Sequence, residues 1–600
     1  MKNIFKISLV LFLAGCLCGC SALEQRSKST FEANTVFANY TLARYAVNAI
    51  YEAYITTGSY REDYPEQYGV NTDIERRASL DDTEQNNYAQ YKMSPNNSRF
   101  DRPGEEYYFS GNFKGIERAN LCIKGLKEYG NIDENAQMGA LYGEALTARA
   151  LLYADLLNLY GEVPARFEPI TQETIYLPKS DKDVIYKQLL SDLETAAKYM
   201  SYEGQQYITY PGKACAQGMY ARLALQASGY SCRPDEGKVN TGAMGTVRKS
   251  NDPELQASVL YPKALEALKD VIENSGLGLA PKFEDIWKFF CDMGATYRSK
   301  ENPEIIFGLP FGENRGQFLT RNAVPNTKYN VTSNPRVTLM PSFYFKFDPD
   351  DTRRDITGGP LKYGADGKAT DSGLTAGLMY IRKFRMDWRS PEHAFTQSGA
   401  EDGCKIVYLR YADILLMAAE IANELGNLDE AKGYMRPVLV RAYQNEEKAD
   451  DYLGRLTDKE SFFDAVKDQR AFEFAGERLR KADLIRWGIL KQAIDEAKVD
   501  LQCMHDLTGK FSQFNNTFWW RLKENSIEAE FYGLNPGETD TPPNDGKGTW
   551  TKKTYFSTLG QTSIDNLYLE DPDMYMYRPI PATIITANLG VLKNDYGYTF

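Results

Sequence analysis

A tryptophan flanked by a carboxylate and a guanidinium is the group of residues in this chain whose chemistry is easiest to name. Trp388 lies in the segment FRMDWR at 384–389, between Asp387 and Arg389. A flat apolar ring can cover the C–H side of a pyranose, and planar polar groups beside it can satisfy the sugar hydroxyls. The types and spacing of these three residues therefore predict a saccharide-binding loop.

Two further aromatic groups offer the same chemistry. Trp519 and Trp520 are adjacent in the sequence, and a tyrosine-rich charged segment nearer the N-terminus contains Tyr60 and Tyr64. We predict these four side chains as ligand-binding residues on the same grounds. A ring of this kind can instead pack beneath its own loop, and the residues by themselves leave both interpretations open.

Catalytic and metal-binding patterns are not found in the sequence. The chain has 82 carboxylates, so no acid pair can be singled out, and its 2 histidines, His393 and His505, lie outside any H-E-x-x-H run. No nucleophile elbow, phosphate-binding loop or complete dinucleotide fingerprint occurs. The segment 348–353 has Arg353 where a calcium loop needs glycine. We therefore expect no enzyme activity, no cofactor and no metal.

The N-terminus is typical of a bacterial lipoprotein. Two lysines precede an apolar run at 7–13 that is too short to span a bilayer. Cys20 follows the letters LCG, and Cys16 follows LAG, so both resemble the acylated cysteine of a lipobox. The polar, acidic segment after Cys20 favours that residue as the lipid attachment site, with Cys16 as the alternative. We predict a signal peptide at 1–19 and a tether at 20–36.

Composition indicates a globular protein that neither spans a membrane nor binds polyanions. The chain has 600 residues, of which 42% are hydrophobic and 25% charged, and no later stretch reaches the apolar length of a membrane span. Losing two lysines with the signal peptide takes the formal net charge from −12 to −14, which disfavours nucleic acid as a partner. Tyrosine, with 41 residues, is unusually frequent and supplies apolar faces with polar edges.

Helices with one buried stripe must position these candidate residues. Between 137 and 160 the apolar residues recur every three or four positions, which is the helical period, and Gly161 and Pro164 end the pattern. Similar patterns predict helices at 107–129, 181–200, 216–229, 257–274, 409–423, 429–443, 458–475 and 479–497. Small residues in the stripes allow close packing of stacked helix pairs. We predict a mainly α fold, a tetratricopeptide-like scaffold of helical hairpins.

Long irregular stretches at 56–104, 302–405 and 502–578 separate groups of these helices and contain every aromatic candidate named above. Loops of such length inside a globular chain are usually functional. No linker divides the chain into independent parts. We therefore predict a single large domain, in which an N-terminal region at 37–252 packs against a C-terminal region at 253–600.

Several motifs, in this order along the chain, resemble those of the SusD/RagB family of Bacteroidetes surface lipoproteins. They are LYGEVP at 159–164, GMYARLAL at 218–225, LRYADILL at 409–416, EFAGE and DLIRWG within 473–488, and PIP and NDYGY within 579–598. Two features depart from the family pattern. The segment before DLIR reads LRKA, without the usual tryptophan, and Glu24 is the one acid near the predicted mature N-terminus.

The resemblance implies a non-catalytic protein that captures glycans at the outer membrane. Members of the family are held there by lipid, face the cell exterior, and close over a SusC-like TonB-dependent transporter. Some members are associated with peptides, so a peptide-binding protein is the alternative within the family. A surface glycoside hydrolase or an adhesin would explain fewer of the features.

Charged residues interrupt the apolar faces of the predicted helices. Burying a charge is expensive unless an opposite charge and hydrogen bonds compensate it. We therefore predict that these residues form ion pairs that fix helix register, and that they do not contact ligand. They are Arg149, Arg222, Arg410, Asp413, Glu420, Arg470, Glu473, Glu477, Asp483 and Arg486.

Overall fold

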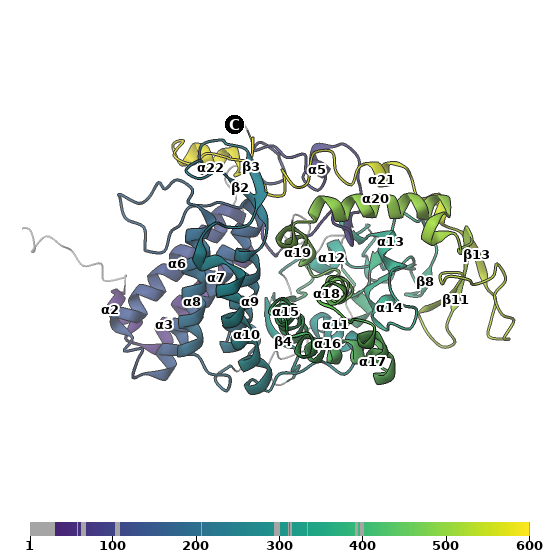
Figure 1. The fold of residues 1–600 in the computed structure, drawn as a ribbon, viewed down its shortest axis with the longest axis horizontal. Coiled ribbons are helices and arrows are strands. Elements are labelled where there is room, and N and C mark those ends of the chain that lie inside the picture. Colours follow the sequence, from purple (N-terminus) through teal and green to yellow (C-terminus); the bar gives the residue numbers. More distant parts are fainter. Residues whose placement is uncertain are drawn as a thin grey trace, which may run out of the picture.

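Helices form the two halves of an elongated molecule, and a small sheet lies at the far end of the second half (Figure 1). The computed structural model describes residues 31–56, 58–61, 68–101, 108–205, 207–292, 301–309, 311–312, 315–332, 334–390, 394–395 and 401–598. The signal peptide, Cys16, Cys20 and Tyr64 lie outside these ranges. The helices of the first half are α2 (Ala33–Phe37), α3 (Tyr40–Asn48), η1 (Ala49–Ile55), α6 (Tyr108–Tyr129), α7 (Ala136–Tyr160), α8 (Lys182–Tyr199), α9 (Lys213–Ser228) and α10 (Ala257–Asn274).

Consecutive helices of the first half pack as hairpins. Helix α6 lies on α7, α7 on α8, α8 on α9, and α9 on α10. Close approach depends on small residues, since a Cβ at Gly115 of α6 would lie 2.7 Å from Leu152 Cδ1 of α7. Asp181 caps α8 by accepting a hydrogen bond from the Asp183 amide. The predicted scaffold of stacked helical hairpins is confirmed.

In the second half, two of the expected helices have different bounds, and the helices at 283–291 and 446–454 were not predicted. The longer helices of this half are α11 (Phe283–Cys291), α15 (Tyr411–Glu424), α16 (Leu428–Tyr443), α17 (Glu446–Gly454), α18 (Lys459–Phe474), α19 (Arg480–Trp487) and α20 (Leu490–Asp506). Leu409 belongs to a strand, so the helix expected from that residue begins at Tyr411. The single helix expected at 479–497 is two helices, because Gly488 adopts a φ of 73° and breaks it.

Strands are short and occur mostly in pairs. Antiparallel pairs join β1 (Glu75–Arg77) to β5 (Val337–Leu339), β2 (Ser231–Pro234) to β3 (Gly245–Arg248), β4 (Ile305–Leu309) to β10 (Ile406–Arg410), β6 (Gly358–Gly359) to β9 (Tyr380–Ile381), and β7 (Lys362–Tyr363) to β8 (Ala369–Thr370). The one larger sheet in the described ranges has the order β12-β11-β13, from Ala529–Tyr532, Thr517–Leu522 and Thr551–Thr554. The long loops are thus tied down locally by backbone pairing.

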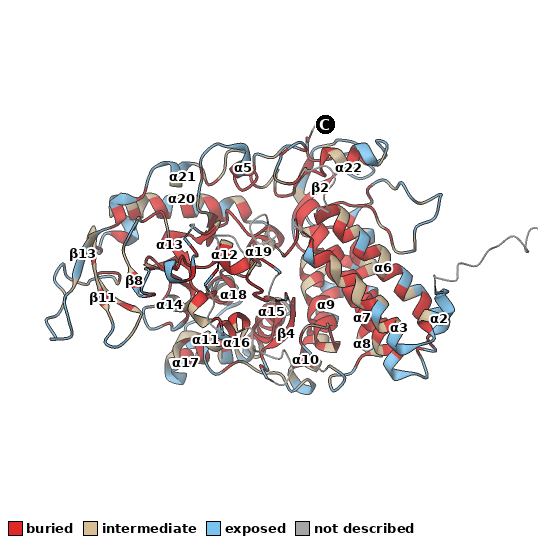
Figure 2. Ribbon diagram, turned by 180° about the vertical axis from the view of Figure 1, so that it is seen from behind, coloured by how far each residue is buried: buried red, intermediate tan, exposed pale blue. Residues whose placement is uncertain are grey.

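Buried residues line the facing sides of the helices in both halves, whereas the terminal sheet is largely half-buried or exposed (Figure 2). One hydrophobic cluster contains residues on both sides of position 252, such as Leu152 and Leu416. A second surrounds α19 and α20 and reaches the C-terminus. This continuity suits a single large domain, and the division at 252 remains a prediction. In the part of the chain described here, no helix is both long and apolar enough to cross a membrane.

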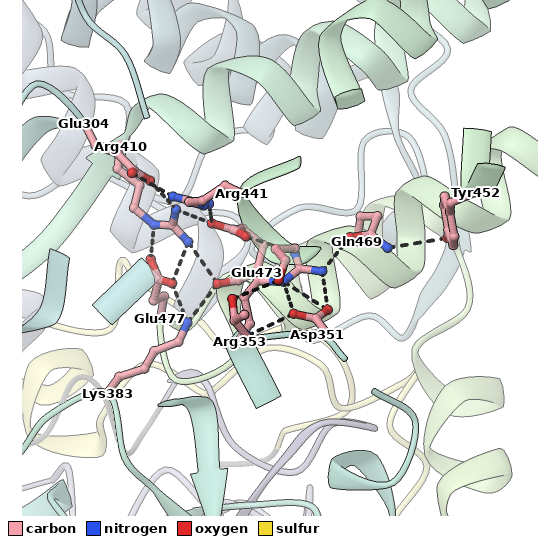
Figure 3. A network of polar contacts seen from close by, with 12 residues as sticks. Glu304, Asp351, Arg353, Lys383, Arg410, Arg441, Tyr452, Gln469, Glu473 and Glu477 are labelled. Carbon is pink, nitrogen blue, oxygen red and sulfur yellow. Dashed lines mark hydrogen bonds and ion pairs between the residues drawn. The ribbon is translucent and has the colours of Figure 1, made fainter. Parts of the chain in front are cut away.

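A buried network of ion pairs joins the elements of the second half (Figure 3). Arg410 donates hydrogen bonds to Glu304 at 2.8 Å, to Glu473 at 2.6 Å and to Glu477 at 2.8 Å. These carboxylates also bind cationic groups of Arg353, Arg441 and Lys383. Burial alone would raise the pKa of Glu473, but Arg441, Arg410 and Arg353 hold it well below the ordinary value.

The other predicted charges are paired as well. Arg149 binds Asp192, and Arg222 and Arg470 share Asp413. Arg470 and Arg486 both bind Asp483, and Arg486 also binds Glu420. Each of the ten residues therefore has an oppositely charged partner, as the cost of isolated buried charge requires. Their role in helix packing agrees with the prediction.

Lys481 gives a pH-dependent prediction. Its ammonium is buried 4.8 Å from the Tyr91 ring centroid, and burial and nearby Arg578 lower its pKa from 10.5 to about 7. Between these two values the unfolded chain holds a proton that the folded chain lacks, so this group makes the unfolding free energy rise with pH. We expect Lys481→Met to be more stable than the wild type at pH 6.

The comparison is made by urea unfolding between pH 6 and pH 9. Above pH 7, the unfolding free energy of the wild type should rise relative to that of the variant by up to about 1.4 kcal/mol per pH unit. This slope corresponds to one proton bound by the unfolded chain and not by the folded chain. Lys432→Met, which removes a half-buried lysine of α16, controls for loss of a lysine. Parallel pH profiles for wild type and Lys481→Met would show that Lys481 stays charged in the folded protein.

Candidate functional site

The terminal sheet presents two chemically different faces. Strand β11 lies between β12 and β13, with Trp519 opposite both Tyr532 and Lys552. Side chains alternate across a pleated strand, so Trp519 and Arg521 share one face while Phe518 and Trp520 share the other. We call the face with Trp519 the outer face, because the opposite one packs on hydrophobic clusters.

Three aromatic rings gather on the outer face. Trp519 and Tyr532 are cross-strand neighbours, and the Trp550 ring centroid lies 6.3 Å from that of Tyr532. All three rings are half-buried. The Arg521 guanidinium lies 4.1 Å from the Trp550 ring centroid, and the Lys552 ammonium lies 5.2 Å from that of Trp519. The outer face therefore joins apolar ring surface to fixed cations.

Carboxylates hold these cations in place. Arg521 makes two hydrogen bonds to Asp545, each of 2.6 Å, and a further one to Glu530. Lys552 binds Asp540 at 2.7 Å. The hydrogen bond from Arg521 lowers the pKa of Asp545, and the one from Lys552 lowers the pKa of Asp540. These groups stay charged and oriented at neutral pH, so hydroxyl groups of a ligand would meet fixed planar partners.

Trp520 lies on the opposite face of the sheet from Trp519. Its indole N–H donates to Asp371 at 3.1 Å, and its ring packs against the second and third hydrophobic clusters. Phe518 beside it is fully buried. The two adjacent tryptophans predicted as one ligand-binding pair thus lie on opposite faces, and Trp520 anchors the sheet to the rest of the molecule.

Trp388 lies at the end of the short helix η4 (Met386–Trp388), where its ring is half-buried. Arg385 approaches the ring centroid to 4.7 Å and binds Asp387 at 2.5 Å. Arg385 also contacts Glu528, the residue just before β12. The loop of Trp388 and the terminal sheet, which are far apart in sequence, are therefore joined through one guanidinium.

The remaining predicted residues lie in other surroundings. Arg389 is buried, with its guanidinium 5.9 Å from the Phe395 ring centroid. Tyr60 is only 3% exposed, its hydroxyl donates to Asp155 at 3.1 Å, and its ring packs on Tyr408. Both placements favour packing over ligand contact, because neither side chain has a face open to solvent. Tyr64 lies outside the described residues.

Sequence reasoning missed Trp550 and Tyr532. The signal was present, since three of the six tryptophans fall between 517 and 554 in a stretch without core-like periodicity. Tyr532 could be paired with Trp519 only once the strand register was known. The described residues contain no group of three or more His, Cys, Asp or Glu placed to hold a metal.

Two family models and several known proteins are similar to this chain. The model described as "SusD family" matches residues 303–598, and the one described as "Starch-binding associating with outer membrane" matches residues 23–225. A SusD-like protein of Formosa agariphila is 25% identical over 398 residues, which are 64% of this chain and 70% of that protein.

Solved structures share the fold over most of their length. A SusD homolog from Bacteroides thetaiotaomicron matches with a TM-score of 0.67 and 18% identity, covering 94% of this chain and 98% of that one. Surface glycan-binding protein A from the same species, solved with laminarihexaose, matches with a TM-score of 0.58 and 16% identity, covering 92% and 99%. With family models matching both halves in order and the fold shared, this chain belongs to the SusD/RagB family.

Proposed function

We propose that the protein is a cell-surface lipoprotein that binds oligosaccharides and delivers them to a SusC-like TonB-dependent transporter in the outer membrane. The observation that carries the binding step is the outer face of the terminal sheet. There Trp519, Tyr532 and Trp550 gather on one surface, beside ion-paired side chains with fixed orientation. Ring faces and planar polar groups together are what saccharides require.

The charge of this face indicates a neutral glycan. Three carboxylates, Glu530, Asp540 and Asp545, are shared between only two cations, Arg521 and Lys552. An anionic polysaccharide would meet net negative charge here, and the whole chain also carries a formal charge of −12. We therefore propose uncharged sugar chains as the ligand class.

Anchoring and partner complete the proposal. The lipobox before Cys20 supports attachment to the outer membrane through lipid, and the family model over residues 23–225 is described as associating with that membrane. A surface glycan-binding protein among the solved structures of this fold supports a role at the cell exterior. Delivery to a transporter rests on the family resemblance.

The test uses the full-length protein extracted from outer membranes. In affinity electrophoresis, at least one gel containing starch, laminarin, xylan or mannan should retard the protein. Gels containing the anionic polysaccharides alginate or carrageenan should not retard it. The protein should release no reducing sugar from any of these polymers. Retardation by none of the neutral polymers, or by anionic ones alone, would contradict the proposal, and release of reducing sugar would indicate a glycoside hydrolase. A TonB-dependent transporter should co-purify in mild detergent, and recovery of the protein alone would contradict delivery but not binding.

A further inference from the structure

A pocket of about 680 Å³ opens on the first half of the molecule, where α3, α7 and α8 line it. Figure 1 shows these three helices at the opposite end of the molecule from the terminal sheet. The pocket lies between α3, the start of α7, the end of α8 and the loop residues 201–205 and 207–212. We call it the tyrosine pocket, because four tyrosines line it: Tyr40, Tyr199, Tyr207 and Tyr210. None of the residues considered above as ligand contacts belongs to it.

Small residues on α7 create the hollow. Ala136 and Ala140 lie one turn apart and line the pocket, and Glu144 follows one turn deeper. On the adjoining face, a Cβ at Gly143 would lie 2.8 Å from Met200 Cγ, so glycine is needed for α8 to end so close to α7. The walls are thus set by backbone packing, and the pocket exists without a ligand.

The loop at the rim is also fixed. The Gln205 side-chain amide donates to the carbonyl of Tyr210 at 3.0 Å and to that of Ile306 in β4 at 3.0 Å. These two hydrogen bonds fix the backbone beside Tyr207 and Tyr210. The rings of these two tyrosines lie 6.5 Å apart and nearly perpendicular, at 79°. Tyr207 on the loop is 37% exposed and Tyr40 on α3 is 42% exposed. Two rings of the lining therefore keep faces available to a bound molecule.

The charged side chains of the lining are already paired, since Arg44 binds Glu144 and Lys198 binds Glu194 at 3.4 Å. Arg44 makes two hydrogen bonds to Glu144, of 2.7 and 2.6 Å, and the Tyr51 hydroxyl donates to the same carboxylate at 2.7 Å. The guanidinium of Arg44 also lies 4.8 Å from the Tyr210 ring centroid. These planar groups are pre-oriented, and their charges cancel. A neutral molecule with hydroxyl groups and apolar faces suits this lining, whereas a charged one would have to compete for Arg44, Glu144 or Lys198 with the ion-pair partners that they already have.

We propose that the tyrosine pocket is a second saccharide-binding site, which takes a short segment of a neutral glycan. The inference rests on the proposed function and adds a site remote from the terminal sheet. The pocket is lined from several sides, as small-molecule sites are, so it suits a segment of a sugar chain better than the broad surface of a protein partner. Two separated sites on one chain would hold a polysaccharide more tightly than either alone.

Native mass spectrometry of the full-length protein with maltohexaose, laminarihexaose, xylohexaose and mannohexaose tests this. One of these neutral hexasaccharides should saturate the wild type at two molecules per chain. Tyr40→Ala/Tyr207→Ala should bind one, with the affinity of the second site lowered at least tenfold. Ala140→Trp, which keeps every tyrosine but fills the hollow, should also bind one.

Tyr45→Ala is the matched control, because Tyr45 is exposed on the same helix but does not line the pocket, and it should keep two. Two bound molecules in both pocket variants, or one in the wild type, would overturn the second site and leave the proposed function standing. Two bound sugars combined with loss of a co-purifying membrane protein would assign the surface to a protein partner instead. Binding of no hexasaccharide by the wild type would refute the proposed function and this site together.

Discussion

Replacing Trp519 and Trp550 together by alanine is expected to weaken binding of the neutral glycan by roughly a hundredfold or more. Both rings lie on the outer face of the terminal sheet, where they are half-buried and offer apolar surface. Loss of one large apolar contact costs about 1.5 to 3 kcal/mol, which is roughly a tenfold to hundredfold change in Kd. The two losses need not add, because the rings are close enough to share one sugar. Isothermal titration calorimetry on the folded variant measures the effect.

Trp520→Ala provides the sharpest control, because it changes the neighbouring residue on the opposite face. Its ring packs on hydrophobic clusters, so we expect lower stability by a few kcal/mol and an unchanged Kd. Tyr129→Ala removes an exposed aromatic side chain on α6 and should change neither quantity. Full affinity in the Trp519→Ala/Trp550→Ala protein would show that the outer face is not the platform.

Trp388→Ala tests whether the ligand reaches the loop beside the sheet. Arg385 links that loop to Glu528, so a sugar chain on the sheet could extend toward Trp388. We expect roughly a tenfold weakening in the same titration. An unchanged Kd would assign the Trp388 ring to packing against Arg385 and Lys288.

Arg410→Met is expected to destabilise the fold by about 3 to 5 kcal/mol, the largest stability effect among the single substitutions considered. Arg410 binds three buried carboxylates, those of Glu304, Glu473 and Glu477. Removing its guanidinium leaves these charges short of a partner in a region without water to solvate them. Glycan affinity of the remaining folded protein should be unchanged, because none of these groups reaches the terminal sheet. Urea unfolding at pH 7 measures the loss.

Arg436→Met is the matched control, since Arg436 also forms ion pairs, with Glu446 and Asp450, but its side chain is 40% exposed. Its loss should cost far less stability, because an exposed ion pair gains little from its partner in water. Acid titration adds a second readout. In the wild type the depressed pKa of Glu473 gives stability that is present above its unfolded value of 4.5 and lost as pH falls below it. Arg410→Met weakens that depression, so its acid-dependent loss should be smaller. A stability change for Arg410→Met no larger than that for Arg436→Met would contradict the role of the network.

The helical scaffold could be predicted from the sequence because its signals are local. The expected helix at 257–274 matches α10 residue for residue. Hydrophobic periodicity reports which face of a segment is buried, whatever it packs against. The pairing of the buried charges could be predicted for a different reason, namely that an unpaired charge in a core strongly destabilises the fold. Which charge pairs with which, as Arg410 does with Glu304, depends on how distant segments meet.

Backbone geometry decided where two predicted helices begin and end. Periodicity runs on through Gly488 because the side chains on both sides are apolar, yet its left-handed conformation starts a new helix. Leu409 fits the period of α15 but pairs with β4 in strand β10, because its own helical tendency is weaker than the pairing available in the folded chain.

The residues of the candidate site are brought together only by the tertiary structure. Sequence alone determined that this protein has a hairpin scaffold, paired internal charges and aromatic residues outside the helical hairpins, whereas the strands that carry Trp519, Trp520 and Tyr532 were not predicted. The sequence placed Trp519 and Trp520 together, and only the pleat of β11 separates them into a ligand-facing and an anchoring residue. Trp550 and Tyr532 reach Trp519 through strand register and a returning loop, which no local pattern encodes. Long-range contacts of this kind arise from packing of the whole chain, so their partners cannot be inferred from the spacing of residues along it.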